Sequence, residues 1–157
     1  MTAEATQARS VTVRRASIED VDAIVAMGRQ FLTTDYAHAL IVDDTSLRTL
    51  AGKFASGATD VIGLVVRSET HDPIGMVGAF VYAHPLSGER TVSEMVWWVD
   101  PDWRGSSVGT RLLHGLEAWA ADQGATRLEM IAPSDRVGAF YERLGFQRVE
   151  THYWKAL

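Results

Sequence analysis

The 157-residue chain contains no cysteine. Without thiols the protein can form no disulfide, no thiolate-bound metal site and no covalent intermediate on a cysteine sulfur. Long apolar runs are absent as well, since the longest, Ile74–Ala83, is too short to span a bilayer. The first ten residues, MTAEATQARS, lack the apolar core of a signal peptide. We therefore expect a cytoplasmic protein with no membrane partner.

Two further absences narrow the classes of ligand. No block of lysine or arginine stands out and the formal net charge is −5, so we expect no nucleic-acid partner. The five histidines include no pair spaced four residues apart, so we expect no metal site. What is present, 46% hydrophobic and 22% charged residues, suits a soluble globular protein. Because no linker or repeat divides the chain, we expect a flexible tail over residues 1–10 and one domain over residues 11–157.

Apolar periodicity predicts the order of the elements. Alternating or continuous apolar runs predict strands over Val11–Arg15, Asp60–Arg67, Ile74–Ala83, Thr91–Val99, Thr126–Ile131 and Phe146–Trp154. Helical spacing and capping residues predict helices after Ser17, from Asp44, from the loop near Gly109 to Gly124, and from Ser134 or Asp135 to Gly145. The resulting order, βααβββαβαβ, predicts the α+β class, with a central mixed, mostly antiparallel and splayed sheet flanked by helices.

One segment, VDPDWRGSSVGT at Val99–Thr110, joins a predicted strand to a predicted helix. The first N–H groups of a helix have no intrahelical partner, and the helix dipole favours negative charge beside them. A glycine-containing loop at this place can therefore hold a pyrophosphate through its backbone. An ordinary strand–helix turn would have the same pattern, so the loop alone does not decide between the two.

A second segment, AFYERLGF at Ala139–Phe146, follows the first one along the chain. The two segments and the spacing between them are together more specific than either segment alone. Together with VDPDWRGSSVGTRLL and the order of elements, the second segment resembles the GNAT N-acetyltransferase superfamily, which binds acetyl-CoA. Arg104 and Gly109 fill the first and last positions of that family's Q/R-x-x-G-x-G/A loop. Ser107 replaces the middle glycine, where its hydroxyl can donate to a phosphate oxygen. The resemblance implies that acetyl-CoA is bound by Trp98, Val99, Arg104, Gly105, Ser106, Ser107, Val108, Gly109, Thr110 and Ser134.

The same resemblance implies two catalytic residues. Tyr141 stands where the family places a general acid that protonates the thiolate of coenzyme A. Its helical spacing would equally suit a core aromatic. Glu94, on the strand before the loop, is the candidate base for the amine, or a charge that holds a cationic substrate. Strict alternation predicts that Glu94, Val96 and Trp98 point to one face of the sheet.

The acceptor site is less clearly marked. The segment Phe31–Asp44 joins the first two helices and offers Asp35 and Tyr36 as substrate contacts, although a plain connecting loop is equally consistent with it. Trp97 could line the same cleft, or pack in the core. Arg104 and Ser134 likewise have local alternatives, as a surface arginine and a helix N-cap.

The sequence therefore predicts an N-acetyltransferase. It would move an acetyl group from acetyl-CoA to a primary amine, on a small molecule or a peptide, by direct attack through a tetrahedral intermediate. A non-catalytic module that binds acetyl-CoA or coenzyme A is the alternative, because Ser107 departs from the loop pattern. Pairing of the last predicted strand, which carries Tyr153 and Trp154, could support a homodimer.

Overall fold

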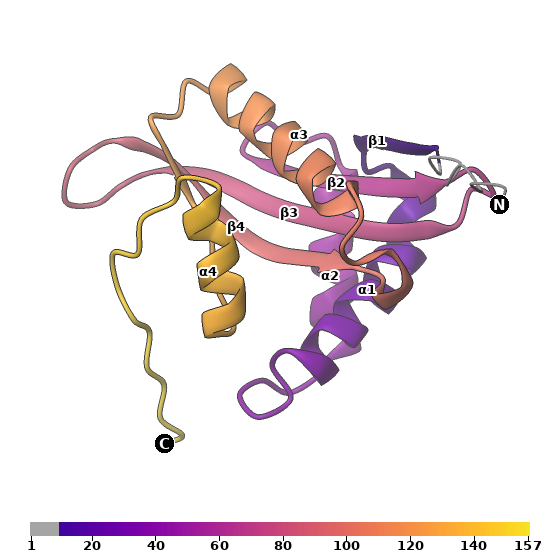
Figure 1. The fold of residues 1–157 in the computed structure, drawn as a ribbon, viewed down its shortest axis with the longest axis horizontal. Coiled ribbons are helices and arrows are strands. Elements are labelled where there is room, and N and C mark those ends of the chain that lie inside the picture. Colours follow the sequence, from indigo (N-terminus) through magenta and orange to yellow (C-terminus); the bar gives the residue numbers. More distant parts are fainter. Residues whose placement is uncertain (1–9) are drawn as a thin grey trace, which may run out of the picture.

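The computed structural model describes residues 10–157 (Figure 1). The predicted tail, residues 1–10, lies outside the described residues except for Ser10. The strands are β1 (Val11–Arg15), β2 (Val61–Ser68), β3 (Pro73–Ala83), β4 (Arg90–Val99) and β5 (Arg127–Glu129). The helices are α1 (Val21–Thr34), α2 (Asp44–Ala55), α3 (Val108–Asp122) and α4 (Asp135–Arg143), with short 3₁₀ turns at Ile18–Asp20 and Pro101–Trp103.

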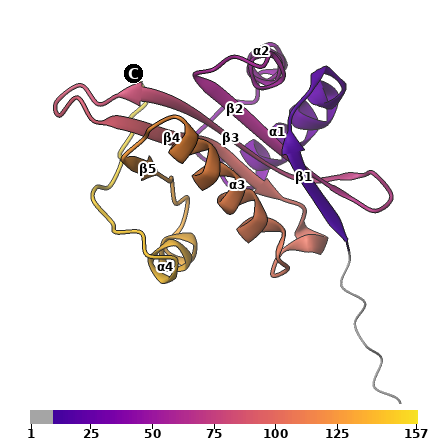
Figure 2. The same cartoon turned by 90° about the horizontal axis from the view of Figure 1, so that it is seen from above.

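The five strands form one sheet in the order β1-β2-β3-β4-β5. All neighbours are antiparallel except β4 and β5, which are parallel. Helices α1 and α2 lie on one face of the sheet, and α3 and α4 lie on the other (Figure 2). Each face carries its own apolar core. The predicted α+β class, with a mixed and mostly antiparallel sheet, is confirmed.

The turn that leads into α1 is held by a buried charge as well as by a capping pair. The Ser17 N–H donates to the Asp20 carboxylate at 2.8 Å, as the sequence predicts. Asp20 is fully buried and also accepts from Arg14 and Arg67, each at 2.6 Å. Burial alone would raise the pKa of Asp20, but these hydrogen bonds outweigh it and hold the pKa well below its ordinary value. The network ties β1, β2 and the entry to α1 together.

A glycine slot in the sheet positions α2. Gly63 of β2 pairs with Gly78 of β3, and the buried Phe54 ring of α2 lies directly over both. A Cβ at either glycine would overlap that ring. The absence of two side chains therefore lets a large aromatic ring approach the sheet backbone.

The prediction of a last strand over Phe146–Trp154 is wrong. Residues 146–157 contain no strand, so the observed order ends with α4, and the strand expected to pair in a homodimer is not formed. The Phe146 N–H bonds the Tyr141 carbonyl at 3.1 Å, after Gly145 turns the chain with φ +92°. The neighbouring edge strand, β5, is only three residues long, so it offers few backbone groups with which a further strand could pair. Tyr153 and Trp154 are exposed.

Among residues 10–157, no helix is both long and apolar enough to cross a membrane.

Candidate active site

A β-bulge in β4 decides which way the candidate base points. Gly78 pairs with Val96 and Ala79 pairs with Glu94, so Met95 is an extra residue without a cross-strand partner. Val96 packs into the core beneath α1 and α2, whereas Ala79, opposite Glu94, belongs to the core beneath α3. The prediction that Glu94, Val96 and Trp98 share one face is therefore wrong. Strict alternation fails at Met95, and Glu94 lies on the face of α3.

Strands β4 and β5 separate at the same level. They pair only from Thr91 with Arg127 to Ser93 with Glu129, and β4 continues to Val99 without a partner on that side. The Asp100 N–H donates to the Ile74 carbonyl at 2.8 Å, toward β3. Because successive peptide groups of a strand point to opposite edges, those of Val99 and Trp97 point to the open edge. The sheet is thus splayed, and Glu94 is the first residue of β4 beyond the last pair.

Ile131, in the segment after β5, forms hydrogen bonds with both candidate catalytic side chains. The Ile131 N–H donates to Glu94 Oε2 at 3.0 Å. The Tyr141 hydroxyl donates to the Ile131 carbonyl oxygen at 3.2 Å. The Trp97 ring stacks on Tyr141, with centroids 5.8 Å apart and planes within 8°. The structure therefore brings Glu94, Tyr141 and Trp97 together at the point where the strands part.

Burial sets the electrostatics of this cluster. Glu94 is 4% exposed, and desolvation raises its pKa from 4.5 to about 7, against the lowering effect of the Ile131 N–H. Desolvation, and then the Glu94 charge, raise the pKa of Tyr141 well above its ordinary value. The same two causes raise the pKa of Tyr36, in the turn after α1, so this residue also lies close to Glu94. Asp35 adds a further negative charge beside Tyr36.

The loop before α3 has the geometry of a backbone anion site. Gly105 has φ +77°, a conformation that favours glycine, and a Cβ there would meet nothing within 4 Å. Ser107 has φ −74° and ψ −2°, which any residue adopts without strain, so its replacement of glycine leaves the turn intact. The Ser106 hydroxyl accepts from the Val108 N–H at 3.3 Å. The N–H groups of Gly109 and Thr110 bond no acceptor among residues 10–157.

The remaining predicted cofactor residues have local partners. The Arg104 Nε donates to the Val99 carbonyl at 2.9 Å, and the guanidinium lies 4.5 Å from the centre of the Trp98 ring. Trp98 itself is buried beneath α1 and α2. The Ser134 hydroxyl caps α4 by accepting from the Val137 N–H at 3.4 Å. The structure therefore places the Arg104 side chain against the end of β4.

Residues 30–146 match the Acetyltransferase (GNAT) family. The chain belongs to this family. It is 36% identical over 56 residues to an aminoglycoside N(6')-acetyltransferase type 1 of Stenotrophomonas maltophilia, a match that covers 34% of this chain and 37% of that protein. The matched part thus spans little more than a third of that relative's length.

Solved structures of GNAT proteins share the fold over nearly the whole chain. Glucosamine-6-phosphate N-acetyltransferase from Arabidopsis thaliana superimposes with a TM-score of 0.75 at 17% identity, covering 94% of this chain and 98% of that one. Aminoglycoside N-acetyltransferase AAC(6')-Iy, in complex with CoA, superimposes with a TM-score of 0.78 at 13% identity, covering 97% of each chain. Family and fold together support acetyl transfer to amines in general.

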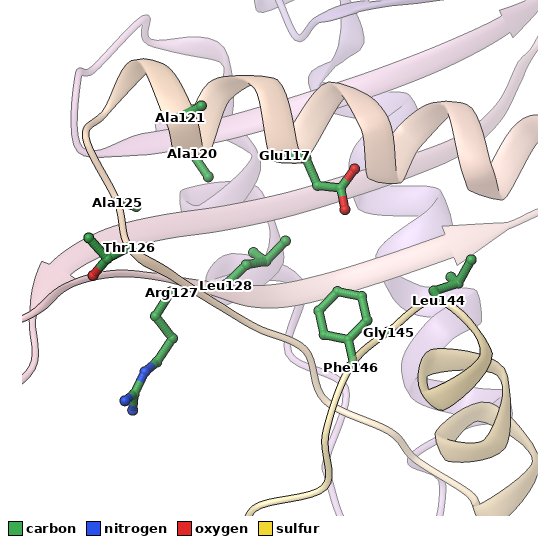
Figure 3. Close-up of a pocket in the computed structure, with 10 residues that line it drawn as sticks. All are labelled: Glu117, Ala120, Ala121, Ala125, Thr126, Arg127, Leu128, Leu144, Gly145 and Phe146. Atoms are coloured by element: carbon green, nitrogen blue, oxygen red, sulfur yellow. The ribbon is translucent and has the colours of Figure 1, made fainter.

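Two open cavities of this GNAT chain lie outside the Glu94 cluster. One, of about 340 Å³, lies between α3, the start of β5 and the turn after α4, with Leu128 and Phe146 facing into it (Figure 3). The other, of about 360 Å³, lies beside the end of β4 and is lined in part by Thr34, Trp98 and Asp100. Neither is lined by Glu94 or Tyr141.

The sequence prediction did not include Ile131, whose peptide groups bond both candidate catalytic side chains. No side-chain pattern reveals such backbone contacts. The available signal was the place of Ile131 at the end of the predicted strand Thr126–Ile131, directly opposite the strand that carries Glu94. Within residues 10–157, no group of three or more histidine, aspartate or glutamate side chains is placed to hold a metal ion.

Proposed function

We propose that the protein is an acetyl-CoA-dependent N-acetyltransferase that acts on a primary amine. The observation that carries the proposal is the pairing of Glu94 and Tyr141 on one residue, Ile131, where β4 and β5 separate. An acid and a base held at fixed positions in one opening suit a reaction that removes one proton and delivers another.

Glu94 is the base in this proposal. A primary amine in water is mostly protonated at neutral pH and must lose its charge before it attacks a carbonyl carbon. A carboxylate with a pKa of about 7 is a much stronger base than one at 4.5, and it is still ionised in a large share of molecules near neutral pH. Desolvation of Glu94 therefore supports its role in accepting that proton, directly or through a water molecule.

Tyr141 is the acid. Its raised pKa keeps the hydroxyl protonated at neutral pH. The hydroxyl is oriented by the Ile131 carbonyl and the ring is held by Trp97, so the proton has a defined position. A thiolate leaving at that position would take the proton from the phenol. With no cysteine in the chain, the amine attacks the acetyl group directly.

The acetyl donor fits the residues present. The unpaired N–H groups of Gly109 and Thr110 and the strain-free backbone of Ser107 suit a pyrophosphate at the start of α3. The outward N–H and C=O groups of Trp97 and the outward N–H of Val99 suit an extended amide-containing arm along β4. Acetyl-CoA, when bound, supplies an activated acetyl group at the Glu94 cluster. We assign Arg104 a supporting role, because its guanidinium already has partners on β4.

The acceptor approaches from the side of α1. Tyr36 and Asp35 lie next to the Glu94 cluster, and their charge and hydroxyl suit a cationic amine. Trp97 contributes the ring that holds Tyr141. The name of the curated relative, an aminoglycoside acetyltransferase, supports a small amine as the acceptor.

The proposal is tested in two steps. Calorimetric titration with acetyl-CoA should show one site per chain, and release of free thiol should then be followed with a panel of primary amines. The rate should rise with pH as Glu94 ionises near pH 7, and Glu94→Gln should lower the rate and remove this dependence. Binding of acetyl-CoA without thiol release for any amine would indicate the non-catalytic module instead.

A further inference from the structure

Ile131 has a side chain that neither the core nor the proposed chemistry uses. It is 51% exposed, although it is one of the large apolar residues of the chain. Single exposed apolar residues are common on protein surfaces and need no explanation by themselves. Ile131 differs because both of its peptide groups bond the two reacting side chains, Glu94 at 3.0 Å and Tyr141 at 3.2 Å.

These two hydrogen bonds hold the Ile131 backbone, and with it the Ile131 Cβ, beside Glu94. The Cβ of a residue lies about 2.5 Å from its own nitrogen, so the Ile131 Cβ is within about 5.5 Å of Glu94 Oε2. A β-branched side chain is also stiff about its first torsion. Ile131 therefore presents a rigid apolar surface next to the buried carboxylate.

The Ile131 side chain is not part of the core beneath α3. Leu128 and Met130, on the same chain segment, pack against that core, whereas Ile131 is half exposed. Ile131 comes two residues after the end of β5, where β4 and β5 have separated. Tyr36, in the turn after α1, also lies close to Glu94. Ile131 and Tyr36 therefore both lie beside Glu94, where we propose that the acceptor amine binds.

We infer that Ile131 is a specificity-determining residue for the acceptor, and that it selects amines whose carbon chain next to the nitrogen is apolar. The inference rests on the proposed function. An amine nitrogen within hydrogen-bond distance of Glu94 has its next carbons within van der Waals reach of Ile131. Contact with a polar group at that place would cost its hydration and return no hydrogen bond.

The experiment compares two amines of equal length in the same enzyme preparation. Hexylamine has an apolar chain, and 1-aminohexan-2-ol has the same chain with a hydroxyl on the second carbon from the nitrogen. Thiol release at saturating acetyl-CoA gives kcat/KM for each amine, and the ratio of the two does not depend on the folded fraction. Wild type should prefer hexylamine by roughly tenfold or more, the cost of placing that hydroxyl against an apolar side chain. Ile131→Ala and Ile131→Thr should lose most of this preference, and the KM for acetyl-CoA should not change.

Leu86→Ala is the matched control. Leu86 is 93% exposed in the hairpin between β3 and β4, so its loss should leave the ratio unchanged. An unchanged ratio in Ile131→Ala would overturn the inference. So would a wild type that acetylates other primary amines but not hexylamine. Absence of thiol release with every amine tested would overturn the proposed function itself, and the two failures are therefore distinguishable.

Discussion

Replacing Glu94 by glutamine should stabilise the protein at alkaline pH and not at acid pH. The pKa of Glu94 is raised from 4.5 to about 7 by desolvation, so folding favours the protonated carboxyl. Below pH 4.5 the carboxyl is protonated in both states, and burial of the charge costs nothing. As the pH rises from 4.5 to 7 the carboxyl ionises in the unfolded chain but stays largely protonated in the folded one, and about 3 kcal/mol of unfolding free energy is lost. Glutamine is neutral throughout and can still accept the Ile131 hydrogen bond.

The assay is urea unfolding of wild type and Glu94→Gln at pH 5 and pH 8.5. The variant should gain about 2.5 kcal/mol on wild type between the two pH values, which corresponds to roughly 5–10 °C in Tm for a chain of this size. Glu117→Gln, on the exposed face of α3, controls for the loss of one negative charge. A stability difference that is the same at both pH values would refute the reasoning, because it would mean that Glu94 ionises as easily in the folded as in the unfolded chain.

Three other substitutions separate the chemistry from the fold. Tyr141→Phe should lower kcat by roughly 100-fold with little change in acetyl-CoA affinity, measured by thiol release and calorimetry; equal losses in both would indicate a packing role. Gly78→Ala should cost about 1–3 kcal/mol in urea unfolding because its methyl group overlaps the Phe54 ring, and the double variant with Phe54→Leu should recover part of that loss. Asp20→Asn should cost about 3 kcal/mol or more at pH 7, because two arginines lose a fully buried charge partner; a loss below 1 kcal/mol would show that the network is dispensable.

Much of the fold follows from local signals in the sequence. Ser17 and Asp20 form the predicted capping pair, and the loop before Gly109 leads into a helix as expected. These features depend on residues close together in the chain, so short-range pattern is enough to place them. Tyr141 could be assigned to the site because the family's motif fixes its distance from that loop.

The errors arose where distant segments decide the outcome. The face of the sheet to which Glu94 points depends on one extra residue, Met95. Such a bulge is a property of two paired strands, so the alternation of residues in one strand cannot reveal it. The final strand had the right pattern at Phe146–Trp154, but β5 is too short to pair with it. The link through Ile131 is made by backbone atoms, and these are the same in every residue.

The extra residue in β4 also changes what kind of mutation the protein can tolerate. Before the bulge, the even-numbered residues of β4 up to Glu94 point to the face of α3. After it, the even-numbered residues from Val96 onward point to the face of α1 and α2. Exchanging Met95 for another residue would keep both orientations. Deleting it would turn either Glu94 or everything after it to the wrong side of the sheet, with every other residue still present. In this strand the chemistry is therefore encoded by a count of residues as much as by their identity.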